Sequence, residues 1–64
     1  MKKYYIGYHN KPWDMTDFTI MAETENFVVA GAIVEMYHEG YKKVGISTNL
    51  KIYENRNLPE NAHY

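Results

Sequence analysis

The sequence predicts a single α+β domain in which one helix lies on a small antiparallel sheet, in the order strand–strand–helix–strand–strand. Two N-terminal segments, residues 3–9 and 16–22, alternate apolar and polar side chains with the period of two that is typical of strands. A strongly apolar segment with helix start and stop signals follows them. We expect residues 1–54 to form the domain and residues 55–64 to form a polar C-terminal tail.

The first two strands are expected to form a hairpin. Pro12 interrupts the chain between them, and the connection is too short for the crossover that parallel strands need. One face of the first strand would carry Tyr4, Ile6 and Tyr8, and one face of the second would carry Phe18, Ile20 and Ala22.

A helix is predicted from Thr24, which is a plausible N-cap, to about Glu39. Glu25 in the first turn complements the positive end of the helix dipole. Gly40 stands where a left-handed residue commonly ends a helix, and Tyr41 would supply the hydrophobic contact of a Schellman motif.

Beyond the helix, residues 43–47 alternate again and predict a third strand. Thr48 and Asn49 would form a tight turn, and residues 50–53 would form a fourth strand or continue the third. Residues 55–64 are polar and contain a proline, so we expect them to be loose unless a partner holds them.

The size of the chain makes its own core marginal. It has 64 residues and no cysteine, which excludes disulfides and thiolate zinc sites as the means of stabilising it. The N-terminus is too polar for a signal peptide, and the longest apolar run, residues 27–34, is too short for a membrane span. We therefore expect a cytoplasmic protein with no membrane partner and, since it begins with Met and shows no tag, a complete small gene product.

The predicted helix is apolar on more sides than one sheet can cover. Residues 27–34 contain no polar side chain, and a segment that is apolar all round is usually buried all round. This pattern predicts a homodimer about a two-fold axis, with an alternative in which a small sheet curls around the first two turns. The expected dimer interface consists of Phe27, Val28, Gly31, Ala32 and Glu35.

Charge is sorted into blocks, although the formal net charge is only −1. Residues 1–13 hold lysines and no acid, residues 14–39 hold acids and no lysine or arginine, and residues 40–64 are again mainly basic. The basic N-terminal block also contains aromatic residues. Single-stranded nucleic acid is bound by this combination, because cations contact the phosphates and rings stack on the bases. The residues expected to bind RNA or single-stranded nucleic acid are Lys2, Lys3, Tyr5, His9, Lys11, Trp13, Lys42, Lys43 and Lys51.

Two other interpretations of these residues stay open. Tyrosine is a good strand former and lysine on an edge strand blocks aggregation, so the pattern also fits a purely structural role. Seven Tyr, two Phe and one Trp also suit a protein interface, and the acids at Asp14, Asp17, Glu23 and Glu25 would then face a basic protein surface.

No pattern in the sequence indicates catalysis, a metal or a cofactor. Glu35 and His38 have the i, i+3 spacing of di-metal carboxylate proteins, but that site needs four helices and more carboxylates. Ser47 is the only serine and has no nearby base, and the four glycines are isolated rather than grouped in a phosphate loop. We expect a protein that acts by binding and is not an enzyme.

The composition resembles that of small early proteins made by phages of low-GC bacteria. Six Lys, six Asn and seven Tyr stand against one Arg, as in Lys2-Lys3-Tyr4-Tyr5 and Tyr53-Glu54-Asn55-Arg56-Asn57. This resemblance implies a small, often dimeric binder that takes over the host by blocking an enzyme, a DNA-packaging protein or a transcript. It favours a regulatory RNA binder in the host cytoplasm or, alternatively, an inhibitor of a host protein.

Overall fold

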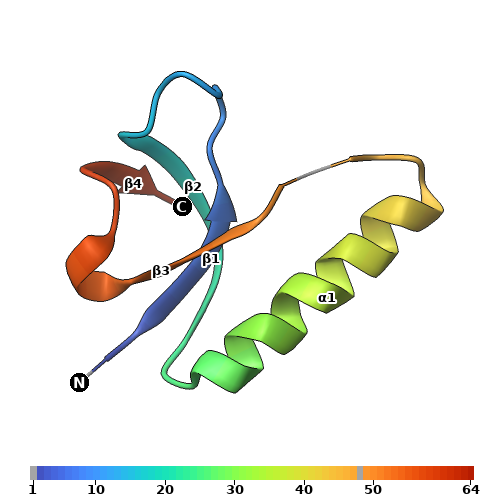
Figure 1. The fold of residues 1–64 in the computed structure, drawn as a ribbon, viewed down its shortest axis with the longest axis horizontal. Coiled ribbons are helices and arrows are strands. Elements are labelled where there is room, and N and C mark those ends of the chain that lie inside the picture. The colour runs from blue at the N-terminus through green and yellow to red at the C-terminus, as the bar shows by residue number, and fades with distance from the viewer. Residues whose placement is uncertain (1, 48) are drawn as a thin grey trace.

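The computed structural model describes residues 2–47 and 49–64, and these residues form one helix and a four-stranded sheet (Figure 1). The predicted α+β class is therefore confirmed. The elements in chain order are β1 (Tyr4–Tyr8), β2 (Asp17–Thr24), α1 (Phe27–Lys43), β3 (Lys51–Glu54), the short 3-10 helix η1 (Asn55–Asn57) and β4 (Asn61–His63).

The sheet is mixed, which corrects the expected antiparallel arrangement. Its strand order is β3-β1-β2-β4; β1 is antiparallel to β2 and β3, whereas β4 is parallel to β2. The two edge strands thus run in the same direction, and the segment containing η1 connects one edge of the sheet to the other. Figure 1 shows η1 on the side of the sheet away from α1.

The core is small and centres on the β1–β2 hairpin. The register shifts between Ile6 and Gly7, and a Cβ at Gly7 would lie 1.9 Å from the backbone oxygen of Thr19. This bulge lets the two strands approach closely. The buried apolar side chains are Ile6, Phe18, Ile20 and Ala30.

The helix begins two residues later than expected because Thr24 is still part of the sheet. Thr24 is paired with Tyr4, and its hydroxyl accepts a hydrogen bond from the Asn26 amide at 3.2 Å. The side-chain oxygen of Asn26 accepts from the amides of Val28 and Val29, so Asn26 is the N-cap.

The helix also ends later than expected. It continues through Gly40 to Lys43, and the left-handed residue after it is Gly45, with φ of +76°. The Ile46 amide donates to Tyr41 O at 2.9 Å and the Gly45 amide to Lys42 O at 3.2 Å, which is the Schellman pattern.

The strand predicted for residues 43–47 does not form, because the last residue of α1 and this Schellman turn occupy the segment. The next strand is β3, which covers most of the predicted 50–53 strand. The predicted tight turn includes Thr48, which lies outside the described residues.

Residues 55–64 are not a loose tail. The Asn61 amide donates to Thr16 O at 2.8 Å, and His63 Nε2 lies 3.0 Å from Asp17 Oδ1. The predicted tail therefore supplies η1 and the edge strand β4. In the described part of the chain, no helix is long and apolar enough to cross a membrane.

Candidate functional site

The N-terminal lysines lie close to acids on neighbouring strands, and one of these acids, Glu54, also pairs with Arg56. Lys2 Nζ lies 3.9 Å from Glu54 Oε1, and Lys3 Nζ lies 3.8 Å from Glu23 Oε1. These pairs arise because β1 is the inner strand between β2 and β3, whose ends carry the two glutamates. Exposed ion pairs of this kind contribute little stability, but they cancel charge locally. Both lysines are thus less available to phosphates than the sequence alone suggested.

His9 belongs to an aromatic cluster and also lines the hollow that Lys51 borders. Its Nδ1 donates to Asp17 O at 2.7 Å, so Nε2 accepts from the Tyr53 hydroxyl at 2.7 Å. The His9 ring lies 5.2 Å from the Phe18 ring, and Phe18 meets Tyr53 edge-on at 4.9 Å. Tyr5 is half-buried and is the cross-strand neighbour of Tyr53. His9 and Tyr5 therefore help to hold the sheet together.

Four of the predicted cations carry no ion pair among the described residues: Lys11, Lys42, Lys43 and Lys51. Lys51, at the start of β3, lines a hollow of about 430 Å³ together with Tyr8 and Pro12. Lys42, in the last turn of α1, lines a second hollow of about 360 Å³. Ser47 borders both hollows, so the two adjoin.

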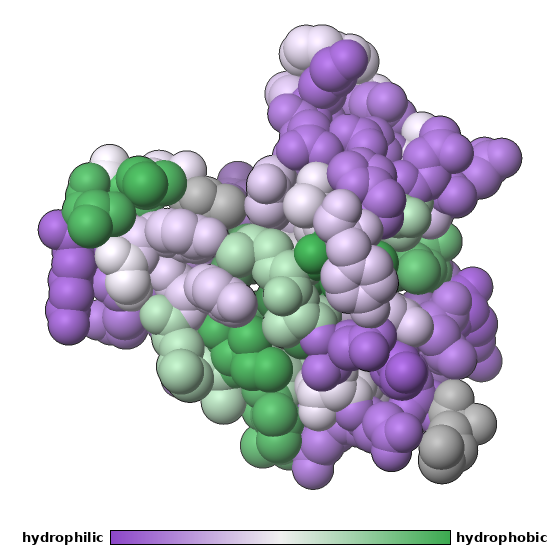
Figure 2. Space-filling view, turned by 180° about the vertical axis from the view of Figure 1, so that it is seen from behind, coloured by the Kyte–Doolittle hydropathy of each residue, from purple (hydrophilic) through white to green (hydrophobic). Residues whose placement is uncertain are grey.

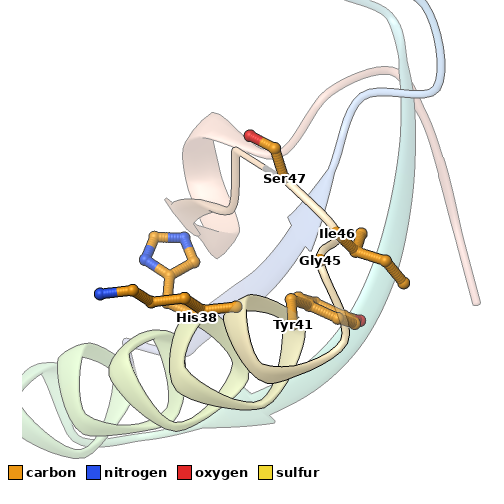
Figure 3. A pocket seen from close by; sticks show the side chains of 6 residues that line it. His38, Tyr41, Gly45, Ile46 and Ser47 are labelled. Atoms are coloured by element: carbon orange, nitrogen blue, oxygen red, sulfur yellow. The ribbon is translucent and has the colours of Figure 1, made fainter.

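The second hollow is built by the Schellman turn that ends α1. Figure 3 shows the His38 ring and the Ser47 side chain on one side, with Ile46 and Tyr41 on the side nearer the sheet. His38 and Ser47 were not predicted as binding residues. The sequence signal for this hollow is Gly45 followed by Ile46, a glycine–apolar pair that can end a helix. The same pattern occurs at Gly40 and Tyr41, where the helix was expected to end.

Trp13 is presented to solvent on a hydrogen-bonded turn of the β1–β2 connection. Its side chain is 78% exposed, and the Asp14 amide next to it donates to Lys11 O at 3.2 Å. Asp14 Oδ1 accepts from the hydroxyl and the amide of Thr16, and these hydrogen bonds lower the pKa of the Asp14 carboxyl.

We call the group of Lys11, Trp13, Lys42 and Lys51 the cationic end. Pro12 and Lys51 line the same hollow, and Ser47 links that hollow to Lys42. In Figure 1 the β1–β2 connection, the C-terminus of α1 and the start of β3 all lie in the upper half, away from the N-terminus. The predicted basic patch is thus divided between two lysines that lie beside acids and the cationic end.

The acidic block does not form one free surface. Asp17 accepts from Asn10 and faces His63, and these two contacts, in that order, lower the pKa of its carboxyl. Glu23 is paired with Lys3 and accepts from the Tyr64 hydroxyl at 2.7 Å, which raises the pKa of Tyr64. These acids instead connect β2 to its neighbours.

The outer face of α1 is apolar and uncovered. Only Ala30 of the helix is fully buried, while Val28 is 78% and Met36 73% exposed. Figure 2 shows apolar areas over the N-terminal half of α1 and at its C-terminal end. Among the predicted interface residues, Val28, Ala32 and Glu35 are exposed, Gly31 is half-buried, and the Phe27 ring rests 5.3 Å from Tyr4.

No group of three or more His, Asp or Glu side chains within residues 2–47 and 49–64 is arranged to hold a metal ion. No protein-family model, curated protein or solved structure matches the chain. What the surfaces can bind is therefore argued from their own residues.

Proposed function

We propose that this protein is a non-enzymatic binding protein that holds RNA or other single-stranded nucleic acid at the cationic end. The observation that supports this proposal is that the predicted lysines differ in whether an acid lies beside them. Lys2 and Lys3 each lie beside an acid, whereas Lys11, Lys42 and Lys51 carry no ion pair among the described residues. Lys42 and Lys51 line adjoining hollows, and Lys11 and the exposed Trp13 flank Pro12, which lines one of them.

Each part of this surface suits a part of a nucleotide chain. The lysine ammonium groups neutralise phosphates and release counterions, so the binding weakens as salt rises. Trp13 stacks on a base, a contact worth about 1–3 kcal/mol and tolerant of sequence. His38 and Tyr8 lie at the hollows as further aromatic or polar contacts. The composition resemblance to phage early proteins adds a regulatory role in a host cytoplasm to this proposal.

The test compares two sets of lysines. In Lys11→Gln/Lys42→Gln/Lys51→Gln, we expect affinity for a fluorescently labelled single-stranded oligonucleotide to fall at least tenfold at low salt. For single strands, each phosphate contact contributes about −0.7 to the slope of log affinity against log salt concentration. Removing three contacts should therefore make this slope shallower by about 2. Fluorescence polarisation measures both quantities, and circular dichroism checks that the variant is folded.

Lys2→Gln/Lys3→Gln is the matched control, since it also removes neighbouring positive charges but at the paired end. We expect it to bind within about twofold of the unchanged protein. Equal losses in the two variants would contradict the proposed location, and binding that survives the triple change would contradict the lysine-based mechanism.

A protein-binding inhibitor is the second candidate function. The observation that favours it is the exposed apolar side of α1, because contiguous apolar surface on a small protein usually marks an interaction site. Two of the four acids predicted for such an interface, Asp17 and Glu23, contact neighbouring elements of the sheet instead.

A further inference from the structure

The outer side of α1 carries a regular stripe that points away from the sheet. With Ala30 facing the sheet, the residues on the opposite side follow spacings of four and three, which is the pattern of a coiled-coil seam. The stripe consists of Val29, Ala32, Met36, Glu39 and Lys43, all exposed, and Glu25 lies just before the N-cap at its N-terminal end.

We propose that this stripe pairs with the same stripe of a second copy of the chain, with the two helices antiparallel about a two-fold axis near residue 34. In that arrangement Met36 of one protomer lies over Ala32 of its partner, and the reverse contact is made at the same time. The long, flexible Met36 side chain then fills the space above the small Ala32 side chain of the other protomer. Val28 and Val29 extend the apolar contact, and the paired length is about 26 Å at 1.5 Å per residue.

Charge at the two ends of α1 selects a second copy and this orientation. Glu25 precedes the helix and Lys43 ends it, and neither has an ion-pair partner in the described part of the chain. Antiparallel pairing places Glu25 of each protomer opposite Lys43 of its partner, whereas parallel pairing would oppose like charges. Antiparallel pairing also sets the two helix dipoles in opposition.

The small core gives the second reason for this pairing. Ile6, Phe18, Ile20 and Ala30 are the buried apolar residues of the described chain, and α1 contributes only the last of them. Domains of this size commonly add stability by oligomerisation. The proposed stripe is rotated from the interface expected from the sequence. It keeps Ala32, leaves Val28 and Glu35 at its flank, and replaces Phe27 and Gly31 with Val29 and Met36.

The first experiment is light scattering on the full chain without nucleic acid, so its outcome is independent of the proposed function. We expect a mass of twice 7.6 kDa at micromolar concentration and a single-chain mass for Met36→Lys, with unchanged circular dichroism. A single-chain mass for the unchanged protein up to about 100 μM would overturn the proposal, as would a Met36→Lys variant that remains a dimer.

A charge exchange tests the orientation. Glu25→Lys and Lys43→Glu should each raise the dimer dissociation constant about tenfold, and the double variant should return it to within about threefold of the unchanged value. Glu60→Lys is the matched control: it makes the same charge change at an exposed residue outside the stripe and should have little effect. Failure of the double variant to recover would contradict the antiparallel pairing.

Discussion

Gly7 is the position where the sheet tolerates no side chain. An added Cβ would lie 1.9 Å from Thr19 O and 3.0 Å from the Phe18 ring, and the first of these is backbone that cannot move aside without breaking the hairpin. We expect Gly7→Ala to lower the free energy of unfolding by about 3 kcal/mol, near the upper end of the usual cost of overpacking. Urea denaturation followed by circular dichroism measures it.

Gly40→Ala is the control for Gly7→Ala, because the same substitution is expected to stabilise the protein at this position. It lies inside α1 with nothing within 4 Å of an added Cβ, so Gly40→Ala should raise the free energy of unfolding by about 0.5–1 kcal/mol. A Gly7→Ala protein as stable as the unchanged protein would contradict the close approach of β1 to β2.

Single residues also show what the sequence could predict about the binding surface. Trp13 is exposed, as a stacking residue must be, and its place beside a proline in a connection was readable from the sequence. The ion pairs of Lys2 and Lys3 were not, because they depend on which strands flank β1. The hydrogen bond of His9 to Tyr53 was not readable for the same reason, since Tyr53 lies 44 positions further along the chain.

At the scale of elements, β4 is held to β2 by a pH-sensitive contact. Both nitrogens of His63 face acceptors, with Nδ1 at 3.2 Å from Tyr64 O and Nε2 at 3.0 Å from Asp17 Oδ1. The doubly protonated ring therefore fits best. The hydrogen bond to Tyr64 O and then the one to Asp17 raise the pKa of His63 above its ordinary value of 6.5.

The sign of the pH dependence follows from these shifts. The contribution of His63 is complete below pH 6.5 and is lost as pH rises through its raised pKa; that of Asp17 is complete above pH 3.8 and is lost as pH falls through its lowered pKa. We expect the stability difference between the unchanged protein and His63→Gln to be larger at pH 5.5 than at pH 9. Urea denaturation at both values measures it, and a difference independent of pH would contradict the His63–Asp17 contact.

Local sequence signals predict where α1 lies but not where it ends. The apolar character of the helix and, to within two residues, its start were predictable, but two glycine–apolar pairs, at 40–41 and 45–46, carry the same stop signal. Contact with the sheet selects the second pair, since Tyr41 packs from within α1 and its hydroxyl lies 4.0 Å from Met21 Sδ. Once the helix includes Tyr41, residues 43–47 can no longer form the predicted strand.

At the scale of the whole molecule, the α+β class follows from periodicity, whereas the mixed sheet does not. β4 has three residues, too few for an alternation pattern, and its partner strand lies more than 40 positions earlier. Long-range strand pairing also determines which lysines lie beside acids, as Lys2 and Lys3 do. The sequence predicted a basic and aromatic surface, and the fold shows which of its lysines carry no ion pair among the described residues.

The proposed binding of single-stranded nucleic acid at the cationic end can be followed through the fluorescence of Trp13, the only tryptophan in the sequence. Short single-stranded RNA and DNA would be titrated into the full chain at low and moderate salt. We expect saturable quenching that weakens steeply as salt rises, because bases stack on the ring while lysines neutralise phosphates. Fluorescence that does not change at either salt concentration would contradict it.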